Sequence, residues 1–133
     1  MLPSVRSLVA LFALSSAAPA ASLPTDWIDA QTGHRVIRLS PDTGGGSLYF
    51  HQRSYTPEGD KAVIRTRDGI LAVDLTTLGR TPLRTELILP NASPIPTAWH
   101  TREAYFFERQ ENRQKAVHLD TKAVREVVRL PPP

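Results

Sequence analysis

A pattern of one strand, a polar turn that contains threonine and a second strand occurs three times along this chain of 133 residues. The turn threonines are Thr32, Thr77 and Thr121, so the pattern recurs after 45 and then 44 residues. A fixed period of this size, with several strands in each period, is the sequence signature of a β-propeller, in which each period forms one four-stranded antiparallel blade. The period therefore predicts an all-β protein.

The strands of one complete period can be placed between residues 48 and 89. We expect them over 48–55, 61–66, 70–75 and 83–89. The turns at 57–60 and 67–69 each contain the glycine that tight turns favour. The next period begins near residue 98 and continues with strands expected over 104–108, 115–119 and 123–130. Residues 90–96 are expected to be a turn-forming connection, and residues 27–39 supply only the last two strands of a period.

The predicted fold is thus a β-propeller fragment, half a blade plus two four-stranded antiparallel blades, over residues 22–133. A two-stranded hairpin is not stable alone. An open propeller also leaves apolar blade faces and edge strands uncovered, and such edges recruit other chains. We therefore expect the chain to be the front part of a longer propeller, to be marginally stable by itself and to associate through its exposed blade edges.

The first 21 residues have the order of a secretory signal peptide. Arg6 precedes an apolar stretch over 8–14, and small residues follow, including Ala18 and Ala20 on either side of Pro19. The apolar stretch is shorter than the roughly 20 residues that span a bilayer. We expect cleavage near residue 21, a periplasmic or secreted protein, and no membrane anchor after cleavage. The alternative is a disordered alanine-rich tail.

The composition excludes several kinds of site. The chain has no cysteine, so neither disulfides nor cysteine-type zinc sites can form. The net charge is +3, but the arginines and lysines are scattered rather than clustered as in nucleic-acid binders. We expect no nucleic-acid partner, whereas binding of an acidic sugar polymer stays open. The four histidines contain no local pair of metal-ligand spacing, and no metal site is predicted.

Four segments carry a resemblance to a known family. "YTPEGDK" resembles the "SPDGK" turn of exported propeller repeats such as those of the translocation protein TolB. When the residues around this turn are included, the chain resembles the first blades of the oligogalacturonide lyases. The resemblance is carried by the segments "TGHRVIRLS", "GGGSLYFHQRSYTPEGDKAVI", "GILAVDL" and "AVREVVRLP". The resemblance runs from residue 27 to residue 130. It implies a seven-bladed propeller that degrades short pectin fragments.

The resemblance also implies a chemistry, β-elimination on oligogalacturonides. A base removes the proton next to a uronate carboxyl, and a manganese ion stabilises the charge that develops there. In that family the histidine base and the metal ligands come from later blades, so no catalytic or metal-binding role can be assigned to a numbered residue here. The resemblance favours an enzyme, a carbon–oxygen lyase acting on polysaccharides, of which this chain alone is expected to be inactive. Export is a departure, since several family members are cytoplasmic.

Three residues are candidates for binding the substrate. His51 and Arg53 lie two residues apart in the expected strand, so their side chains share a face. They are candidate contacts for a uronate carboxylate, with Arg53 as a bidentate partner. His100 follows Trp99 at the matching place in the next period. The alternative for both histidines is a packed, hydrogen-bonded side chain between blades.

Two further functions compete with the lyase hypothesis. One is a TolB-like periplasmic propeller that serves as a protein-interaction module and performs no chemistry. The other is a decayed remnant without activity. The glycine run followed by "LYFHQ" favours the lyase resemblance, because generic TolB repeats lack it.

Overall fold

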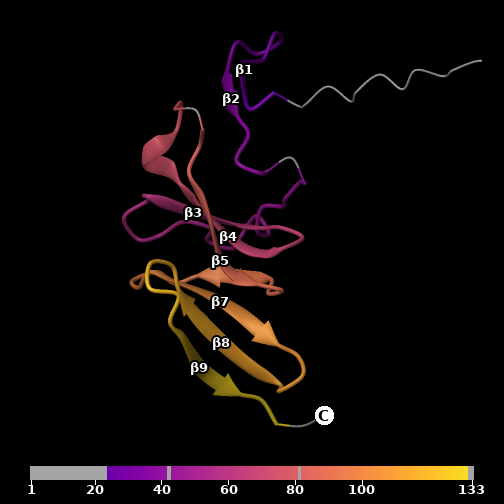
Figure 1. The fold of residues 1–133 in the computed structure, drawn as a ribbon, viewed down its shortest axis with the longest axis vertical. Coiled ribbons are helices and arrows are strands. Elements are labelled where there is room, and N and C mark those ends of the chain that lie inside the picture. Colours follow the sequence, from indigo (N-terminus) through magenta and orange to yellow (C-terminus); the bar gives the residue numbers. More distant parts are fainter. Residues whose placement is uncertain (1–23, 42, 81, 132–133) are drawn as a thin grey trace, which may run out of the picture.

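The computed structural model describes residues 24–41, 43–80 and 82–131, and this part of the chain is all-β, as predicted. Nine strands form three antiparallel sheets, and within each sheet neighbouring strands are consecutive in sequence (Figure 1). The described residues contain no α-helix, only the short 3-10 helix η1 (Leu75–Thr77), and no helix among them could cross a membrane. The signal peptide predicted over residues 1–21 lies outside the described residues.

The three sheets have two, three and four strands. The N-terminal hairpin consists of β1 (Asp26–Ile28) and β2 (Arg35–Ile37). The middle sheet consists of β3 (Lys61–Arg65), β4 (Gly69–Asp74) and β5 (Thr85–Pro90). The C-terminal sheet consists of β6 (Pro94–Thr97), β7 (Glu103–Glu108), β8 (Arg113–His118) and β9 (Val124–Arg129).

The prediction of a continuous strand over 48–55 is wrong, and the middle sheet therefore has three regular strands instead of four. The backbone turns at Tyr49, whose carbonyl accepts from Gln52 N (2.7 Å), while the Gln52 side chain accepts from Tyr49 N (3.2 Å). A side-chain bond of this kind offers the backbone an alternative to a ladder. Only single bridges remain on the outer side of β3, from Gly46 to Arg65 and from Tyr55 to Ala62.

The prediction that residues 90–96 form only a turn-forming connection is also wrong, because strand β6 begins at Pro94. Pro94 and Pro96 lie within this strand. Proline has no N–H to donate to a ladder and is tolerated only at the edge of a sheet. Since β6 is an edge strand of the C-terminal sheet, the two prolines fit there.

The period of about 45 residues has a structural counterpart in one repeated turn. Asp29 directly follows β1, whereas Asp74 and His118 are the last residues of β4 and β8, and the three are spaced by 45 and 44 residues. Each side chain accepts a hydrogen bond from the backbone N–H two residues further on, at 3.1, 2.9 and 3.2 Å. Each backbone N–H also donates across the turn, to the carbonyls of His34, Arg84 and Ala123. The three turns therefore share two hydrogen bonds, with His118 at the place of the two aspartates, although the middle turn is longer and contains η1.

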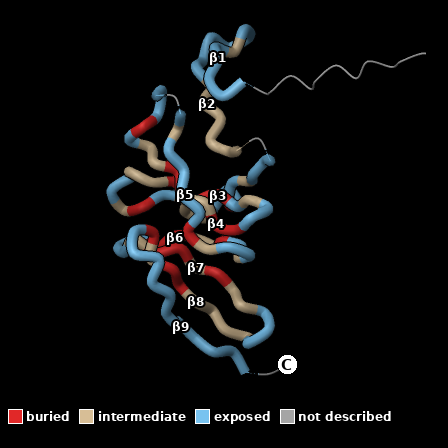
Figure 2. Tube along the Cα trace, in the orientation of Figure 1, coloured by how far each residue is buried: buried red, intermediate tan, exposed pale blue. Residues whose placement is uncertain are grey.

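The middle and C-terminal sheets share one hydrophobic core. Strand alternation places Val63, Ile70 and Ala72 on the same face of the middle sheet. This face packs against Ala104, Phe106, Val117 and Leu119 of the C-terminal sheet, and Ile88 joins the cluster. Buried residues accordingly gather where these two sheets meet (Figure 2). The opposite face of the middle sheet packs Ala62, Ile64 and Val73 against Leu39 and Leu83.

Substitution of a buried and an exposed isoleucine tests this core. Ile70 is fully buried between the sheets, whereas Ile28 is 62% exposed. We expect Ile70→Val to lower the free energy of unfolding by about 0.5–1.5 kcal/mol, because it removes a packed methyl group. Ile28→Val, the same chemical change, should stay within about 0.5 kcal/mol. Urea denaturation checks both, and equal effects of the two substitutions would contradict the assigned core.

Candidate functional site

A hollow beside the turn at Tyr49 and Gln52, which precedes the middle sheet, is the best candidate for a ligand site. Its lining combines aromatic, amide, hydroxyl and guanidinium groups. The lining residues are Ser47, Leu48, Tyr49, Phe50, Gln52, Arg65 and Pro94. Arg65 ends β3 and Pro94 begins β6, so the hollow lies where the middle and C-terminal sheets meet.

The aromatic side of this hollow is open to solvent. Tyr49 is 63% exposed and Phe50 is 87% exposed, and their ring centroids are 4.6 Å apart. His51 packs edge-on against both rings, at 4.9 Å from Tyr49 and 5.3 Å from Phe50. Exposed rings in a group, next to polar groups, are typical of interaction surfaces. The electron-rich ring faces suit the C–H groups of a sugar.

Arg65 supplies the positive charge of the hollow. Lys61, Val63 and Arg65 alternate along β3 and therefore lie on one face of the sheet. Lys61 Nζ contacts Asp120 Oδ1 at 2.6 Å, which neutralises it. No carboxylate in the described part of the chain lies within ion-pair distance of the Arg65 guanidinium. This guanidinium lies beside Gly46, where an added Cβ would be 3.6 Å from Nη2.

The structure separates the candidate residues predicted from the sequence. His51 borders the hollow through its ring contacts with Tyr49 and Phe50. Arg53 lies away from it, over the ring of Trp99 at 4.9 Å from the centroid. His100, exposed, follows Trp99, which is 69% exposed. The binding roles of His51, Arg53 and His100 stay predictions.

The Arg53 guanidinium is largely used inside the fold. Its Nε donates to the Tyr55 carbonyl (2.9 Å) and its Nη2 donates to the Thr56 carbonyl (3.0 Å). The same segment is tied to the C-terminal sheet, because Thr97 N donates to the Arg53 carbonyl (2.9 Å). A bidentate contact through Nε and Nη2 would require both internal bonds to break.

Sequence reasoning missed Ser47, Gln52 and Arg65 as possible ligand contacts. Arg65 was one of several scattered arginines, which are usually solvated. What distinguishes it is the lack of charge on its neighbours across the sheet, Gly46 and Ile70. The sequence did not predict that Arg65 pairs with Gly46, because the segment before β3 forms a turn and not the expected strand.

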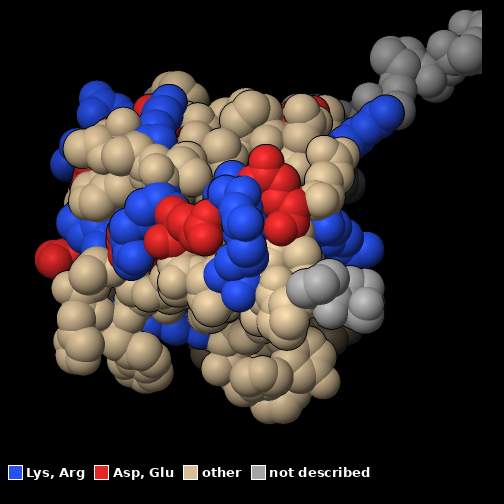
Figure 3. All heavy atoms as spheres, turned by 90° about the horizontal axis from the view of Figure 1, so that it is seen from below, with Lys and Arg blue, Asp and Glu red and all other residues tan. Residues whose placement is uncertain are grey.

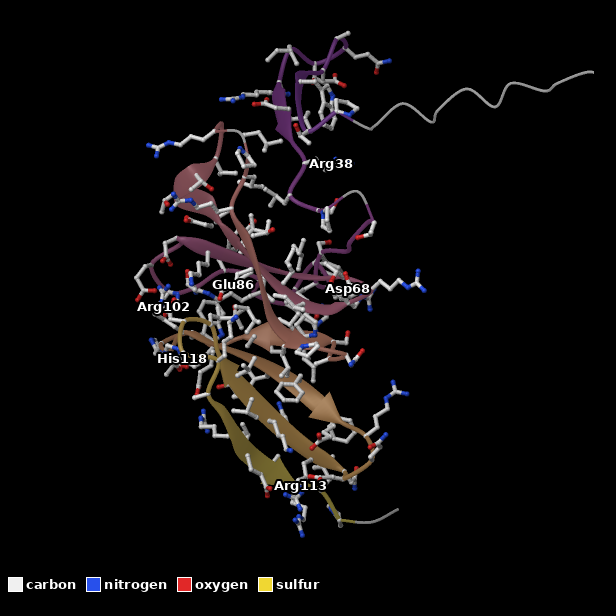
Figure 4. All side chains as sticks on the ribbon, in the orientation of Figure 1. Arg38, Asp68, Glu86, Arg102, Arg113 and His118 are labelled. Atoms are coloured by element: carbon white, nitrogen blue, oxygen red, sulfur yellow. The ribbon has the colours of Figure 1, made fainter. Side chains whose placement is uncertain are left out.

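The densest charge cluster in the described part of the chain lies at the other end of β3, around Arg102. Its guanidinium contacts Asp60 through two bonds of 2.8 Å, Asp120 at 2.6 Å and Glu58 at 2.5 Å. Asp60 precedes β3, whereas Arg102 precedes β7, so the cluster joins the two larger sheets. We call it the Arg102 clamp. Arg102 and His118 lie together at this junction, whereas Asp68 lies on the opposite side of the molecule (Figure 4).

The electrostatics of the Arg102 clamp are those of a closed structural contact. Hydrogen bonds from Arg102 are the largest influence on Asp60 and hold the pKa of its carboxyl at about 2. Arg102, and then Lys61, lower the pKa of Asp120. The same contacts, above all with Asp60, raise the pKa of Arg102. The four charged groups of the clamp, and Lys61 bound to Asp120, thus all have partners, and none points to a ligand.

Charges elsewhere are also mixed in sign. Basic and acidic side chains alternate across the middle of the face seen from the C-terminal end (Figure 3). Ion pairs join strands of the C-terminal sheet: Arg113 of β8 pairs with Glu126 of the neighbouring β9 (2.8 Å), and Arg125 of β9 reaches across β8 to Glu103 of β7 (2.6 Å). In the described residues, no group of three histidine or acidic side chains is arranged to hold a metal ion.

Comparison of the chain with protein-family models, with curated proteins and with solved structures found no match.

The Arg102 clamp predicts a loss of stability in acid. Because the pKa of Asp60 is about 2 in the fold and 3.8 ordinarily, its stabilising effect is complete above about pH 5 and disappears as the pH falls toward 2. We expect Arg102→Gln to lower the free energy of unfolding at pH 7 by about 1–2 kcal/mol, since partly exposed pairs contribute up to about 1 kcal/mol each. The variant should also lose less stability between pH 5 and pH 3 than the original protein does.

Urea denaturation at pH 7, 5 and 3 measures both effects. Arg109→Gln is the matched control, because Arg109 is exposed and has no ion pair among the described residues. An Arg102→Gln protein with an unchanged acid dependence would show that the clamp does not stabilise the fold.

Proposed function

We propose that this chain forms the opening blades of a β-propeller of the oligogalacturonide lyase type, as half a blade followed by two blades. Three observations support the arrangement. One turn recurs in three units, the strands of each sheet follow one another in sequence, and the two larger sheets pack face to face. The N-terminal hairpin corresponds to the last two strands of a unit. The segment over 46–55, which two single bridges join to β3, takes the place of the innermost strand of the first complete blade.

The biochemical function that we propose is recognition of short acidic oligosaccharides, with oligogalacturonides as the substrate class. The observation that carries this proposal is the hollow in which the open rings of Tyr49 and Phe50 lie beside Arg65. Rings bind the C–H faces of sugars, an arginine binds a carboxylate, and Gln52 and Ser47 can exchange hydrogen bonds with hydroxyls. A uronate presents all three kinds of group.

Within a lyase, these blades would hold the substrate and leave the chemistry to other residues. β-Elimination needs a base within hydrogen-bond reach of the abstracted proton and a cation beside the uronate carboxyl. In a complete lyase of this type, a manganese ion would supply that cation. His51 is the nearest candidate contact, and Arg53 and His100 are candidates for a more distant sugar, beside the exposed ring of Trp99. Export to the periplasm or the medium remains part of this proposal.

A TolB-like protein-interaction module is the second candidate. The observation that favours it is the outer strand β9, all six residues of which are exposed. Val124, Val127 and Val128 of this strand, and Leu130 after it, are exposed apolar residues. An unpaired apolar edge recruits strands from other chains. In this alternative, the ligand would be a protein and the hollow would bind no sugar.

The full chain mixed with trigalacturonate and manganese separates these functions. We expect binding with a dissociation constant in about the millimolar range, since a single charge-assisted contact of about 1.5–3 kcal/mol and ring contacts are available. We expect no unsaturated product, because this chain is proposed to bind and not to eliminate. NMR titration measures the binding, and ultraviolet absorbance of the unsaturated uronate measures elimination. Absence of binding at 10 mM, about tenfold above the expected constant, would contradict the proposed function, and product formation would contradict the division of roles.

A further inference from the structure

We propose that Arg65 is the specificity-determining residue of the hollow, the group that selects a carboxylated sugar over its neutral counterpart. The inference rests on the proposed function for its ligand class, a sugar acid. It goes beyond that function because it assigns selectivity to one side chain, which lies outside the segment of His51 and Arg53.

The first argument is that Arg65 alone among the residues that line the hollow carries a charge. Lys61, its neighbour on the same face of β3, is bound to Asp120, and Arg102 is bound to three carboxylates. Arg53 is engaged by two backbone carbonyls. Among these four cations, Arg65 is therefore the one without a partner inside the fold among the described contacts, and Arg67 is the further cation, in the adjoining hollow.

The second argument is that Arg65 also lines a second hollow, on the side of the glycine run. This second hollow is lined by Thr43, Gly44, Gly45, Gly46, Arg65, Thr66 and Arg67. Gly46 has no side chain between its backbone and the guanidinium, so that the guanidinium can lie against the chain. An arginine shared by two adjoining hollows can contact one acidic sugar and remain within reach of the next.

The third argument concerns geometry. A guanidinium is a planar fork that binds a carboxylate through two parallel hydrogen bonds, whereas an ammonium is a point charge. The substitution Arg65→Lys should therefore retain the charge but lose the paired contact. Asp68 lies in the turn after Arg67 and has no ion pair with either arginine among the described contacts, so it does not occupy the fork.

The experiment compares each of two sugar acids, trigalacturonate and a glucuronate-containing oligosaccharide, with its neutral methyl ester, which lacks the negative charge. Binding of each to the full chain is followed by NMR titration, with the backbone amides of residues 44–50 and 65 as reporters. The variants are Arg65→Gln, Arg65→Lys, Phe50→Ala and the control Arg109→Gln. The side chains of Arg65 and Phe50 are exposed, and a retained amide spectrum shows that each variant is folded.

We expect the original protein to bind trigalacturonate about tenfold more tightly than the ester, because one charge-assisted contact is lost with the charge. Arg65→Gln should remove this preference and leave binding of the ester unchanged. Arg65→Lys should keep part of the preference. Phe50→Ala should lower the affinity for the acid and for the ester by a similar factor. Arg109→Gln should leave both affinities unchanged.

The outcomes separate the two levels of the proposal. If trigalacturonate binds but Arg65→Gln retains the preference, the assignment of Arg65 is wrong and the proposed function stands. If the original protein binds only a glucuronate-containing oligosaccharide and Arg65→Gln abolishes the preference for that acid, the assignment stands and the pectin substrate is wrong. If no sugar acid binds more tightly than its neutral ester, the inference is overturned.

Discussion

Face-to-face packing of the middle and C-terminal sheets is the constraint on which the rest of the structure depends. Strand β3 illustrates it, because three residues on one of its faces meet the partner sheet in three different ways. Lys61 forms an ion pair with Asp120, Val63 is fully buried in the shared core, and Arg65 lies in the hollow. The two-residue period of a strand therefore places a charged contact, the core and the candidate site in one row.

One charged contact between the two larger sheets joins residues at matching positions in their hydrogen-bond patterns. Asp60 and Arg102 occupy equivalent positions, since their carbonyls accept from Leu75 N and Leu119 N, each at 2.8 Å. One copy of the unit thus carries an acid where the next carries a base, and the two side chains pair across the interface.

The sequence predicted the all-β class, the repeat and most strands of the two larger sheets, because these follow from local alternation and from glycine turns. It failed for residues 48–55, where a bond from the Gln52 side chain to Tyr49 N replaces a strand. It also could not identify the charged partners of Arg102, or that Arg65 has no carboxylate partner among the described residues. Both depend on how two sheets lie against each other, and residues 42 positions apart in sequence meet there.

Native-state hydrogen exchange of the amides of Val63 and Val117 tests the shared core most directly. The two residues are fully buried, one in each of the larger sheets. If the sheets form one cooperative unit, both amides should exchange with the same free energy of opening, and Ile70→Val in the middle sheet should lower both values equally. Protection of Val117 that persists after Val63 has exchanged, or that is unaffected by Ile70→Val, would show that the sheets open independently and would contradict this account.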